Sequence, residues 1–353
     1  MVAISETVVP VSDAKTVLSY FADHMRKDHG IELDVAEDGS RHLDMEGFCI
    51  DMRVDPRGLY IRIEGPNEGT LIFFKEDVAE HVSEIDATAA ANIRWSGESS
   101  VEGALPVNFK VLKVVSSRPV FPGLQRVTLA HDDVSSLAAD GVHLRLMLPL
   151  ITGRVPKWPR MAANGAPVWP QGDDKLHARI ITLRNVRPTL GEVDVDVVKH
   201  EGGMISRWAA NAESGNAVGI MGPAGKTSPI VSKNMFFAAD GTGLPALARI
   251  IDDLPNDAAG DVVVAVHQDY NVTDYLPPSG FRVHTIAPDR FPSEILGTAR
   301  ELTRRGYTSY AFFAGEFDNA QEMRKHFKDE LGLDKQTQLS AAYWRQGVPG
   351  YGS

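Results

Sequence analysis

The strongest constraint on the fold is a change of rhythm at Met235. After this residue, short apolar runs of strand length alternate with segments of helical length and period. Such alternation is typical of a parallel, doubly wound sheet. The expected strands are Met235–Ala239, Val262–His267, Phe281–Ile286 and Tyr310–Ala314, and the expected helices are Leu244–Leu254, Ser293–Arg305 and Asn319–Leu331. Residues 231–353 should therefore form an α/β domain.

Residues 105–230 have a different pattern, in which six short apolar runs are separated by turns that contain Gly and Pro. The run Val193–Val197 alternates apolar and acidic residues, as a half-buried strand should. Six such strands predict an antiparallel β-barrel. The expected strands are Phe109–Ser116, Leu124–His131, Val142–Leu148, Ala178–Val186, Glu192–His200 and Ala217–Met221. A long loop over Thr152–Lys175 contains Pro, Gly and Trp and is a candidate part of a site.

Residues 1–95 have the pattern of a small α+β domain with a helix at each end. Asp13 is placed to cap a helix that runs to Asp28, and Glu76–Ile85 has the pattern of a second helix. Turn signals separate the strands expected between them. These strands are Ile31–Val35, His42–Phe48, Cys49–Val54, Leu59–Glu64 and Thr70–Phe74. The small, polar segment Ser96–Ala104 should link this domain to the barrel.

Composition excludes several classes of function. The net charge of −11 argues against nucleic-acid binding over a broad surface. Cys49 is the single cysteine, so we expect no intramolecular disulfide and no cysteine-ligated iron–sulfur cluster or zinc site, and redox chemistry needs a bound cofactor. The chain shows neither an apolar run of about 20 residues nor a secretory signal pattern. We therefore expect a cytoplasmic protein without membrane insertion.

Two glycine-containing segments have the pattern of anion sites. In His200–Ser206, Gly202 and Gly203 allow close backbone approach, and Ser206 could cap a short helix whose free N–H groups bind phosphate. The second segment, Asp240–Pro245, joins a buried strand to a helix, where glycines admit the phosphates of a nucleotide cofactor. Neither segment alone is specific, since a glycine turn before a capped helix can also serve packing alone.

The order of these motifs is more informative than any one of them. It resembles the siderophore-interacting protein family, the flavin-dependent ferric-siderophore reductases, over roughly Phe109 to Gly347. The residues that carry the resemblance are Arg179-x-x-Thr182, His200-x-Gly202-Gly203-x-x-Ser206, Gly222-Pro223-x-Gly225, Thr242-Gly243-x-Pro245-Ala246, Gly315-Glu316 and Tyr343-Trp344-Arg345.

The resemblance implies FAD as cofactor and NADPH or NADH, or a reduced ferredoxin, as electron donor. The substrate would be a ferric siderophore, which holds Fe(II) far less tightly than Fe(III), and no resident metal is expected. Thr182 and Glu316 would lie at the reacting end of the site. The implied cofactor contacts are Arg179, Ile181, Thr182, Leu183, His200, Gly203, Met204, Ile205, Ser206, Thr242, Gly243, Pro245 and Trp344. Ile181 departs from the family, which has an aromatic residue at this position.

The resemblance also implies a basic pocket for an anionic chelate. The first position falls on Arg145, and the third falls on the helix that holds Arg324 and Lys325. The second falls near the Gly222–Gly225 turn, where the chain has Ala224 and offers Lys226 close by. A solvated helix face explains Arg324 and Lys325 equally well. Trp344 could stack on an adenine or pack the final strand.

Two other functions stay open. The first is a flavin oxidoreductase that acts on an acceptor other than a siderophore, which would lack the basic pocket. The second is a non-catalytic binding relative, favoured by Ile181 and by Gly241, where an acidic residue is common in the family.

The N-terminal segment resembles a small domain of unknown function (DUF2218) through His24, His29 and Glu80-His81. Three histidines can bind zinc or iron, but His24 and His29 are five residues apart, so they do not share a helix face. Surface or capping histidines are the simpler interpretation, and Cys49 reads as a small buried residue between Phe48 and Ile50.

Overall fold

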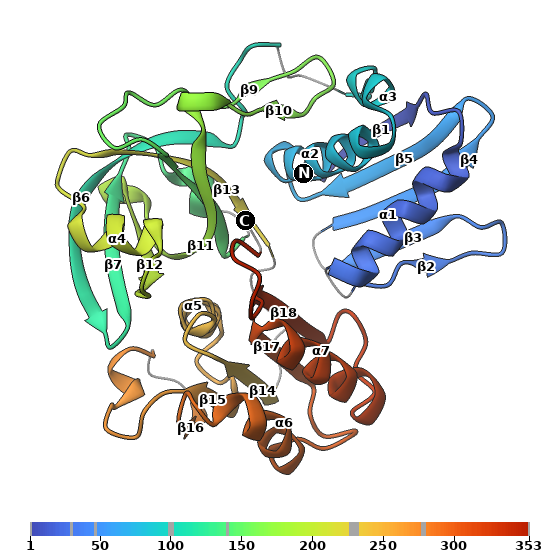
Figure 1. The fold of residues 1–353 in the computed structure, drawn as a ribbon. Helices are drawn as coiled ribbons and strands as arrows, with labels where there is room; N and C mark the ends of the chain where they lie inside the picture. The colour runs from blue at the N-terminus through green and yellow to red at the C-terminus, as the bar shows by residue number, and fades with distance from the viewer. Residues whose placement is uncertain are drawn as a thin grey trace. The chain divides into compact units, whose positions relative to one another are not determined.

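Three principal sheets organise the computed structural model, which describes residues 2–28, 31–45, 48–97, 102–138, 141–225, 233–276 and 280–351. They are a five-stranded antiparallel sheet, a closed six-stranded barrel and a five-stranded parallel sheet (Figure 1). The chain divides into two compact units. The first comprises Met1–Lys110, Met147–His177 and Met221–Pro223, and the second comprises Val111–Leu146, Ala178–Ile220 and Ala224–Ser353.

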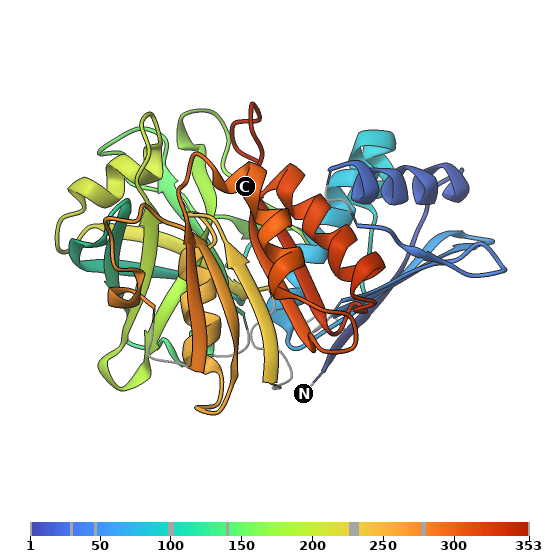
Figure 2. The same ribbon diagram turned by 90° about the horizontal axis from the view of Figure 1, so that it is seen from below.

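The sheet of the first unit has the strand order β1-β5-β4-β3-β2. Its strands are β1 (Ala3–Val9), β2 (Asp34–Val35), β3 (Arg41–Met45), β4 (Phe48–Asp55) and β5 (Gly58–Gly65). The helices α1 (Ala14–Asp28) and α2 (Glu68–Ile85) lie along one face, and the short α3 (Ala87–Ala91) follows α2 (Figure 2). Alternation along β4 explains this packing, because Ile50 and Met52 are buried toward the helices whereas Cys49 and Asp51 are half-exposed on the other face.

The prediction of a strand at Thr70–Phe74 is wrong, because these residues lie in the first turns of α2. The Asn67 side chain caps this helix by accepting a hydrogen bond from the Thr70 amide at 2.9 Å. Threonine, isoleucine and phenylalanine favour strands, but the cap and the packing of Leu71 decide the outcome here. The sequence pattern also missed β1, which pairs along its whole length with β5 from Ala3 opposite Gly65 to Val9 opposite Leu59.

The expected loop at Thr152–Lys175 is built into the first unit. It contains a two-stranded ribbon of β9 (Arg160–Met161) and β10 (Pro167–Val168), followed by the 3-10 turn η2 (Gly172–Asp174). Ala166 joins the core of the N-terminal sheet, and the Asn164 amide donates to the Ala90 carbonyl at 3.1 Å. The Trp169 indole N–H donates to the Glu76 carboxylate at 2.5 Å. This segment therefore completes the packing of the N-terminal residues.

The barrel has the closed order β11-β12-β7-β6-β13-β8. Its strands are β6 (Phe109–Phe121), β7 (Leu124–Ala130), β8 (His143–Pro149), β11 (Leu176–Arg187), β12 (Glu192–Val198) and β13 (Ala217–Ala224). Val127, Leu129, Val193 and Val195 are fully buried. The expectation of a half-buried strand at Val193–Val197 is wrong, because Asp194 and Asp196 are only 3% exposed and β12 is buried on both faces. The 3-10 turns η1 (Ser135–Ala138) and η3 (Pro188–Leu190) lie between strands, and the helix α4 (Met204–Asn211) connects β12 to β13.

The parallel sheet has the order β16-β15-β14-β17-β18. Its strands are β14 (Lys233–Ala239), β15 (Ala259–Ala265), β16 (Gly280–Ile286), β17 (Tyr310–Glu316) and β18 (Gln338–Trp344). The helix α5 (Leu244–Asp253) packs on one face, whereas α6 (Phe291–Leu302) and α7 (Phe317–Lys325) pack on the other. The short turns η4 (Val272–Asp274) and η5 (His326–Glu330) complete this part. The predicted fold class of a small α+β domain, a β-barrel and an α/β sheet is confirmed.

The division into domains at residues 1–95, 105–230 and 231–353 stays a prediction. Among the described residues, no helix is both long and apolar enough to cross a bilayer. Lys226 and His29 lie outside the described residues.

Candidate functional site

The N-terminus of α4 has no side-chain cap, and the His200 ring lies beside the N-cap residue. Gly203 is its N-cap residue and offers no side chain to the free N–H groups of the first turn. Gly202 has a φ of +77°, which favours glycine, and has no neighbour close to the position of a Cβ atom. Ser206 does not cap the helix as we expected. It lies in the first turn, and its hydroxyl oxygen accepts a hydrogen bond from the His200 amide at 3.1 Å, which closes the loop.

Arg179 lies at the same end of the barrel as this loop. Thr182 on β11 pairs with Asp196 on β12, and the two strands are antiparallel. Arg179, within β11, precedes Thr182 by three residues and His200 follows Asp196 by four, so both lie toward the same end of this strand pair. The Arg179 guanidinium donates to the neighbouring Ala178 carbonyl at 2.7 Å, and no carboxylate of the described residues forms an ion pair with it. A cation beside an uncapped helix N-terminus fits a diphosphate group.

The predicted flavin strand is held rigidly around Thr182. This residue is buried, and the Leu183 side chain that follows is fully buried. The Leu183 amide donates to the Val142 carbonyl at 2.8 Å, and its carbonyl accepts from the Arg249 guanidinium at 2.7 Å. Ile181 is half-buried and aliphatic, so it can pack against a ring but cannot offer an aromatic face.

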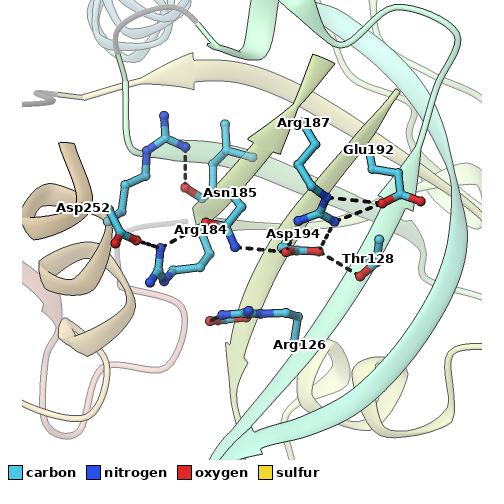
Figure 3. A network of polar contacts seen from close by, with 11 residues as sticks. Arg126, Thr128, Arg184, Asn185, Arg187, Glu192, Asp194 and Asp252 are labelled. Atoms are coloured by element: carbon cyan, nitrogen blue, oxygen red, sulfur yellow. Dashed lines mark hydrogen bonds and ion pairs between the residues drawn. The ribbon is translucent and has the colours of Figure 1, made fainter. Parts of the chain in front are cut away.

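A polar network beside this strand fixes β11, β12 and β7 (Figure 3). The buried carboxylate of Asp194 accepts hydrogen bonds from Arg187 at 2.6 Å, Asn185 at 3.0 Å and Thr128 at 2.8 Å. Burial raises the pKa of Asp194, but these hydrogen bonds outweigh it and lower the pKa to about 2. The group is therefore ionised at neutral pH, and from β12 it accepts hydrogen bonds from side chains of β11 and β7.

A second buried carboxylate links the barrel to the α/β part of the same unit. Asp196 forms a bidentate pair with Arg126, with both distances 2.7 Å, and also accepts from the Tyr275 hydroxyl at 2.6 Å. Arg184 on β11 forms an ion pair with Asp252 at the end of α5 (Figure 3). These contacts hold β11 against α5.

The turn after β14 lies at the carboxyl edge of the parallel sheet, between the neighbouring strands β14 and β17. Here the connections leave in opposite directions, which is where open α/β sheets bind ligands. The Asp240 carboxylate accepts from the Thr242 amide at 2.7 Å and from the Gly243 amide at 3.2 Å. Pro245 occupies the first turn of α5, which carries no side-chain cap. A Cβ atom on Gly243 would lie 2.4 Å from the Ala314 carbonyl oxygen, so the turn requires glycine there.

Glu316 and Trp344 reach the same edge. Glu316 caps α7, because one carboxylate oxygen accepts from the Asp318 amide at 2.6 Å while the other accepts from the Gln346 amide at 3.1 Å. The Trp344 indole N–H donates to the second oxygen of Asp240 at 2.7 Å, and 39% of this residue is exposed. Trp344 therefore does not pack in a core. The structure brings together Thr242, Gly243, Pro245, Glu316 and Trp344 as the order of motifs suggested.

The sequence placed His143 in a segment that fits the family, His143–Pro149, but assigned no role to this residue, which joins the barrel to this edge. Its Nε2 atom lies 2.9 Å from the Tyr343 hydroxyl on β18, and its Nδ1 atom is buried with no hydrogen-bond partner among the described residues. Burial and the charge of Arg249 lower the pKa of His143 to about 4. The imidazole is therefore neutral at physiological pH. The other signal in the sequence was its place two residues before Arg145.

The candidate substrate residues are not equivalent. Arg145 lies half-buried on β8, two residues after His143. Arg324 on α7 donates to the Ser340 carbonyl at 2.6 Å, and burial lowers its pKa, so it anchors α7 to β18. Lys325 is exposed. The interpretation of a fully solvated helix face is therefore wrong for Arg324.

The N-terminal histidines do not all lie on the surface. His81 is buried, and its Nδ1 atom lies 2.7 Å from the Asp77 carbonyl oxygen. The rings of His24 and His81 meet edge to face with their centroids 4.2 Å apart. These contacts tie α1 to α2.

A barrel with an uncapped helix N-terminus, followed by a parallel sheet with a glycine turn at its switch point, defines a two-part flavin-binding architecture. The chain belongs to the siderophore-interacting protein family. Residues 113–227 match the family model described as siderophore-interacting FAD-binding domain, and residues 232–347 match the one described as siderophore-interacting protein. FAD is the cofactor of the matched barrel, and the uncapped α4 N-terminus and Arg179 fit its diphosphate.

Several relatives cover this part of the chain. The ferric vibriobactin reductase ViuB of Vibrio cholerae is 26% identical over 246 residues, which are 67% of this chain and 90% of the relative. The NADPH-dependent ferric-chelate reductase of Escherichia coli K12 is 26% identical over 247 residues, or 67% and 93%. A siderophore utilization protein from T. fusca has a similar structure with a TM-score of 0.56 at 26% identity, covering 71% of this chain and 98% of that one. The siderophore-interacting protein SipS from Aeromonas hydrophila gives 0.55 at 25% identity, covering 68% and 93%.

Proposed function

We propose that the protein reduces Fe(III) held in a siderophore to Fe(II) and so releases the iron in the cytoplasm. The observation that carries the proposal is the pairing of a FAD-binding barrel with a nucleotide-type turn in one compact unit, in a family whose relatives include reductases of ferric chelates. Electrons would come from NADPH or NADH, with a reduced ferredoxin as the other candidate donor.

FAD supplies the chemistry that joins a two-electron donor to a one-electron acceptor. The chain's residues bind and orient. Arg179 and the first turn of α4, with Gly203, Met204, Ile205 and Ser206, would hold the diphosphate. Ile181, Thr182 and Leu183 would line the ring from β11, which the Asp194 network ties to β12.

The second half of the site would receive the nucleotide. Thr242, Gly243 and Pro245 would border its phosphates and nicotinamide at the switch point. The carboxylate of Glu316 is already held by two backbone amides, so we propose that it positions the edge of the sheet and transfers no proton. Trp344 is exposed enough to stack on an aromatic ring.

Arg145 is the proposed contact for an anionic ferric chelate, together with Lys226. Each one-electron transfer needs no bond to the protein, because the electron can pass from the flavin edge to a docked chelate. One hydride from the donor would reduce two Fe(III) chelates and release one proton.

An anaerobic titration tests the proposal. The purified protein is mixed with NADPH or NADH, and then with a ferric siderophore and a ferrous trap, while the visible spectrum is recorded. Bleaching of the flavin by a nucleotide, reoxidation by the chelate and trapped Fe(II) are the expected results. A flavin that quinones reoxidise but ferric chelates do not would instead establish the non-siderophore oxidoreductase, and a protein that binds no added FAD would establish the non-catalytic relative.

A further inference from the structure

The N-terminal sheet has a polar face that the reductase chemistry does not use. Because α1 and α2 cover one face of the sheet, the side chains of the other face point away from the core. Along β4 these are Cys49, Asp51 and Arg53, which alternate with the buried Ile50 and Met52. Hydrophobic packing does not explain the choice of residues on this open face.

Three different metal-ligating side chains converge on this face. His42 on β3 lies directly opposite Asp51 on β4, and Cys49 lies two residues before Asp51 on the same strand. The His42 Nδ1 atom is 2.6 Å from one oxygen of Asp51 and 3.8 Å from the Cys49 sulfur. The sulfur is 3.7 Å from the other oxygen of Asp51. The three ligand atoms all lie within 4.8 Å of one another.

These separations suit one small cation. Zinc binds cysteine sulfur at about 2.3 Å and histidine nitrogen or carboxylate oxygen at about 2.0–2.2 Å, so ligands in a tetrahedron stand about 3.3–3.7 Å apart. The two distances to the sulfur, 3.7 and 3.8 Å, lie at and 0.1 Å above the top of this range, so the main change needed is that the hydrogen-bonded pair of His42 and Asp51 opens. Their side chains are 44% and 39% exposed, so both can turn, and the cation can reach them from solvent.

The charges around the cluster favour a cation. Cys49 is flanked in register by Asp44 on β3 and by Glu64 on β5. Arg62 opposes a cation, since one of its nitrogens lies 3.5 Å from Asp51. Arg62 is held more closely by Glu64, at 2.5 Å, and also by Glu6, at 3.6 Å. It therefore keeps two carboxylate partners when Asp51 turns toward a metal.

From this geometry we infer that His42, Cys49 and Asp51 form a three-ligand site for a divalent transition-metal ion. Thiolate, imidazole and carboxylate together select ions of borderline softness such as Zn²⁺, Co²⁺ or Fe²⁺ over Mg²⁺ or Ca²⁺. The fourth position is left to water, as in sites that exchange their ion or ligand. The inference concerns the first compact unit and does not depend on the proposed reductase function.

The single cysteine of the chain makes the test specific, because every thiol signal comes from Cys49. The full-length protein is reacted with the chromogenic disulfide DTNB, with and without one equivalent of Zn²⁺. We expect bound Zn²⁺ to slow the reaction at least about tenfold, since a metal-bound thiolate is a poor nucleophile, and EDTA to restore the rate. Added Co²⁺ should give a sulfur-to-cobalt charge-transfer band. An unchanged thiol rate under saturating Zn²⁺ overturns the inference, as does the absence of that band.

Isosteric variants separate the site from chance protection. His42→Gln and Asp51→Asn should each raise, at least about tenfold, the Zn²⁺ concentration that halves the rate of the DTNB reaction (half-protection). The rate of each variant is compared with its own rate without metal. Glu37→Gln is the control, because Glu37 is an exposed carboxylate in the turn between β2 and β3 and lies outside the cluster. Half-protection at the same Zn²⁺ concentration in both ligand variants contradicts the site.

Discussion

Arg179 is the side chain on which flavin retention should depend most directly. Its guanidinium has no carboxylate partner among the residues that the structure describes, so its charge is available for phosphate. We expect Arg179→Ala to be purified with little FAD, measured as flavin absorbance released per protein after denaturation. Arg207→Ala on the exposed side of α4 is the control and should keep its flavin. Equal occupancy in both variants would refute the role of Arg179.

Asp194 and Glu192 offer a matched pair of carboxylates around one guanidinium. Both accept from Arg187, but Asp194 is buried with two further donors, whereas Glu192 is partly exposed. Asp194→Asn should lower the free energy of unfolding by about 2–3 kcal/mol, because buried donors lose a charged acceptor. Glu192→Gln should change it by less than about 1 kcal/mol. Urea unfolding of the two variants checks the order, and similar losses would contradict it.

His143 should make stability depend on pH. Its pKa is lowered to about 4 in the folded protein, against an ordinary value near 6.5, so the unfolded chain binds the proton first as the pH falls. The contribution of the neutral His143 side chain to the free energy of unfolding is complete above about pH 6.5. It is lost as the pH falls from about 6.5 to about 4. At about pH 5 the loss should be about 2 kcal/mol.

The variant His143→Gln isolates this contribution. It should show a smaller drop in unfolding midpoint between about pH 7.5 and pH 5 than the unchanged protein, because it removes the titrating group. A parallel drop in both proteins would show that other groups control the pH dependence.

The turn between β14 and α5 is the element whose geometry is least tolerant of change. A Cβ atom on Gly243 would meet the Ala314 carbonyl at 2.4 Å, whereas one on Gly241 would meet no atom within 4 Å. Gly243→Ala should therefore cost about 1–3 kcal/mol of stability and weaken nucleotide binding, while Gly241→Ala should be nearly neutral. Thermal unfolding and flavin reduction by NADPH or NADH measure both effects. A Gly243→Ala variant with unchanged thermal unfolding and unchanged flavin reduction would show that the backbone at this turn can shift freely.

Most helices and strands could be predicted because the residue pattern that specifies each of them lies within a few consecutive residues. The period of two in Val193–Val197 and the alternation of strand and helix after Met235 are set by burial on one or two faces. The strand prediction at Thr70–Phe74 failed because the helix cap at Asn67 outweighs the strand preference of the residues that follow it. Ser206 does not cap α4 because the N-cap lies three residues earlier than expected, at Gly203.

What the sequence could not show depends on pairing between distant residues. His42, Cys49 and Asp51 become neighbours only through the register of β3 and β4. His143 meets Tyr343 across 200 positions of the chain. The motifs of the site could be predicted because each occupies a few consecutive residues. Arg324 shows the converse, since its partner at Ser340 turns an expected surface charge into a structural anchor.

At the scale of the molecule, the first unit cannot be removed by cutting at a linker. Residues 147–177 belong to it although they lie within the barrel sequence. A chain that begins at Leu105 would expose the apolar surface of Met161 and Ala166, which are buried in the full chain. We expect this truncation to aggregate or to be cleaved within residues 147–177, as limited proteolysis with mass spectrometry would show. A truncated chain as resistant as the full-length protein would contradict this prediction.

The interleaving of the first unit also sets an order in time. During synthesis the N-terminal helices and strands leave the ribosome first, and domains generally begin to fold as they emerge. The Ala90 carbonyl must nevertheless wait for Asn164, which is made 74 residues later, and the core must wait for Ala166. The first compact unit therefore cannot complete its folding until much of the barrel has been translated. The folding of this unit is in this way coupled to the synthesis of the part of the chain that follows.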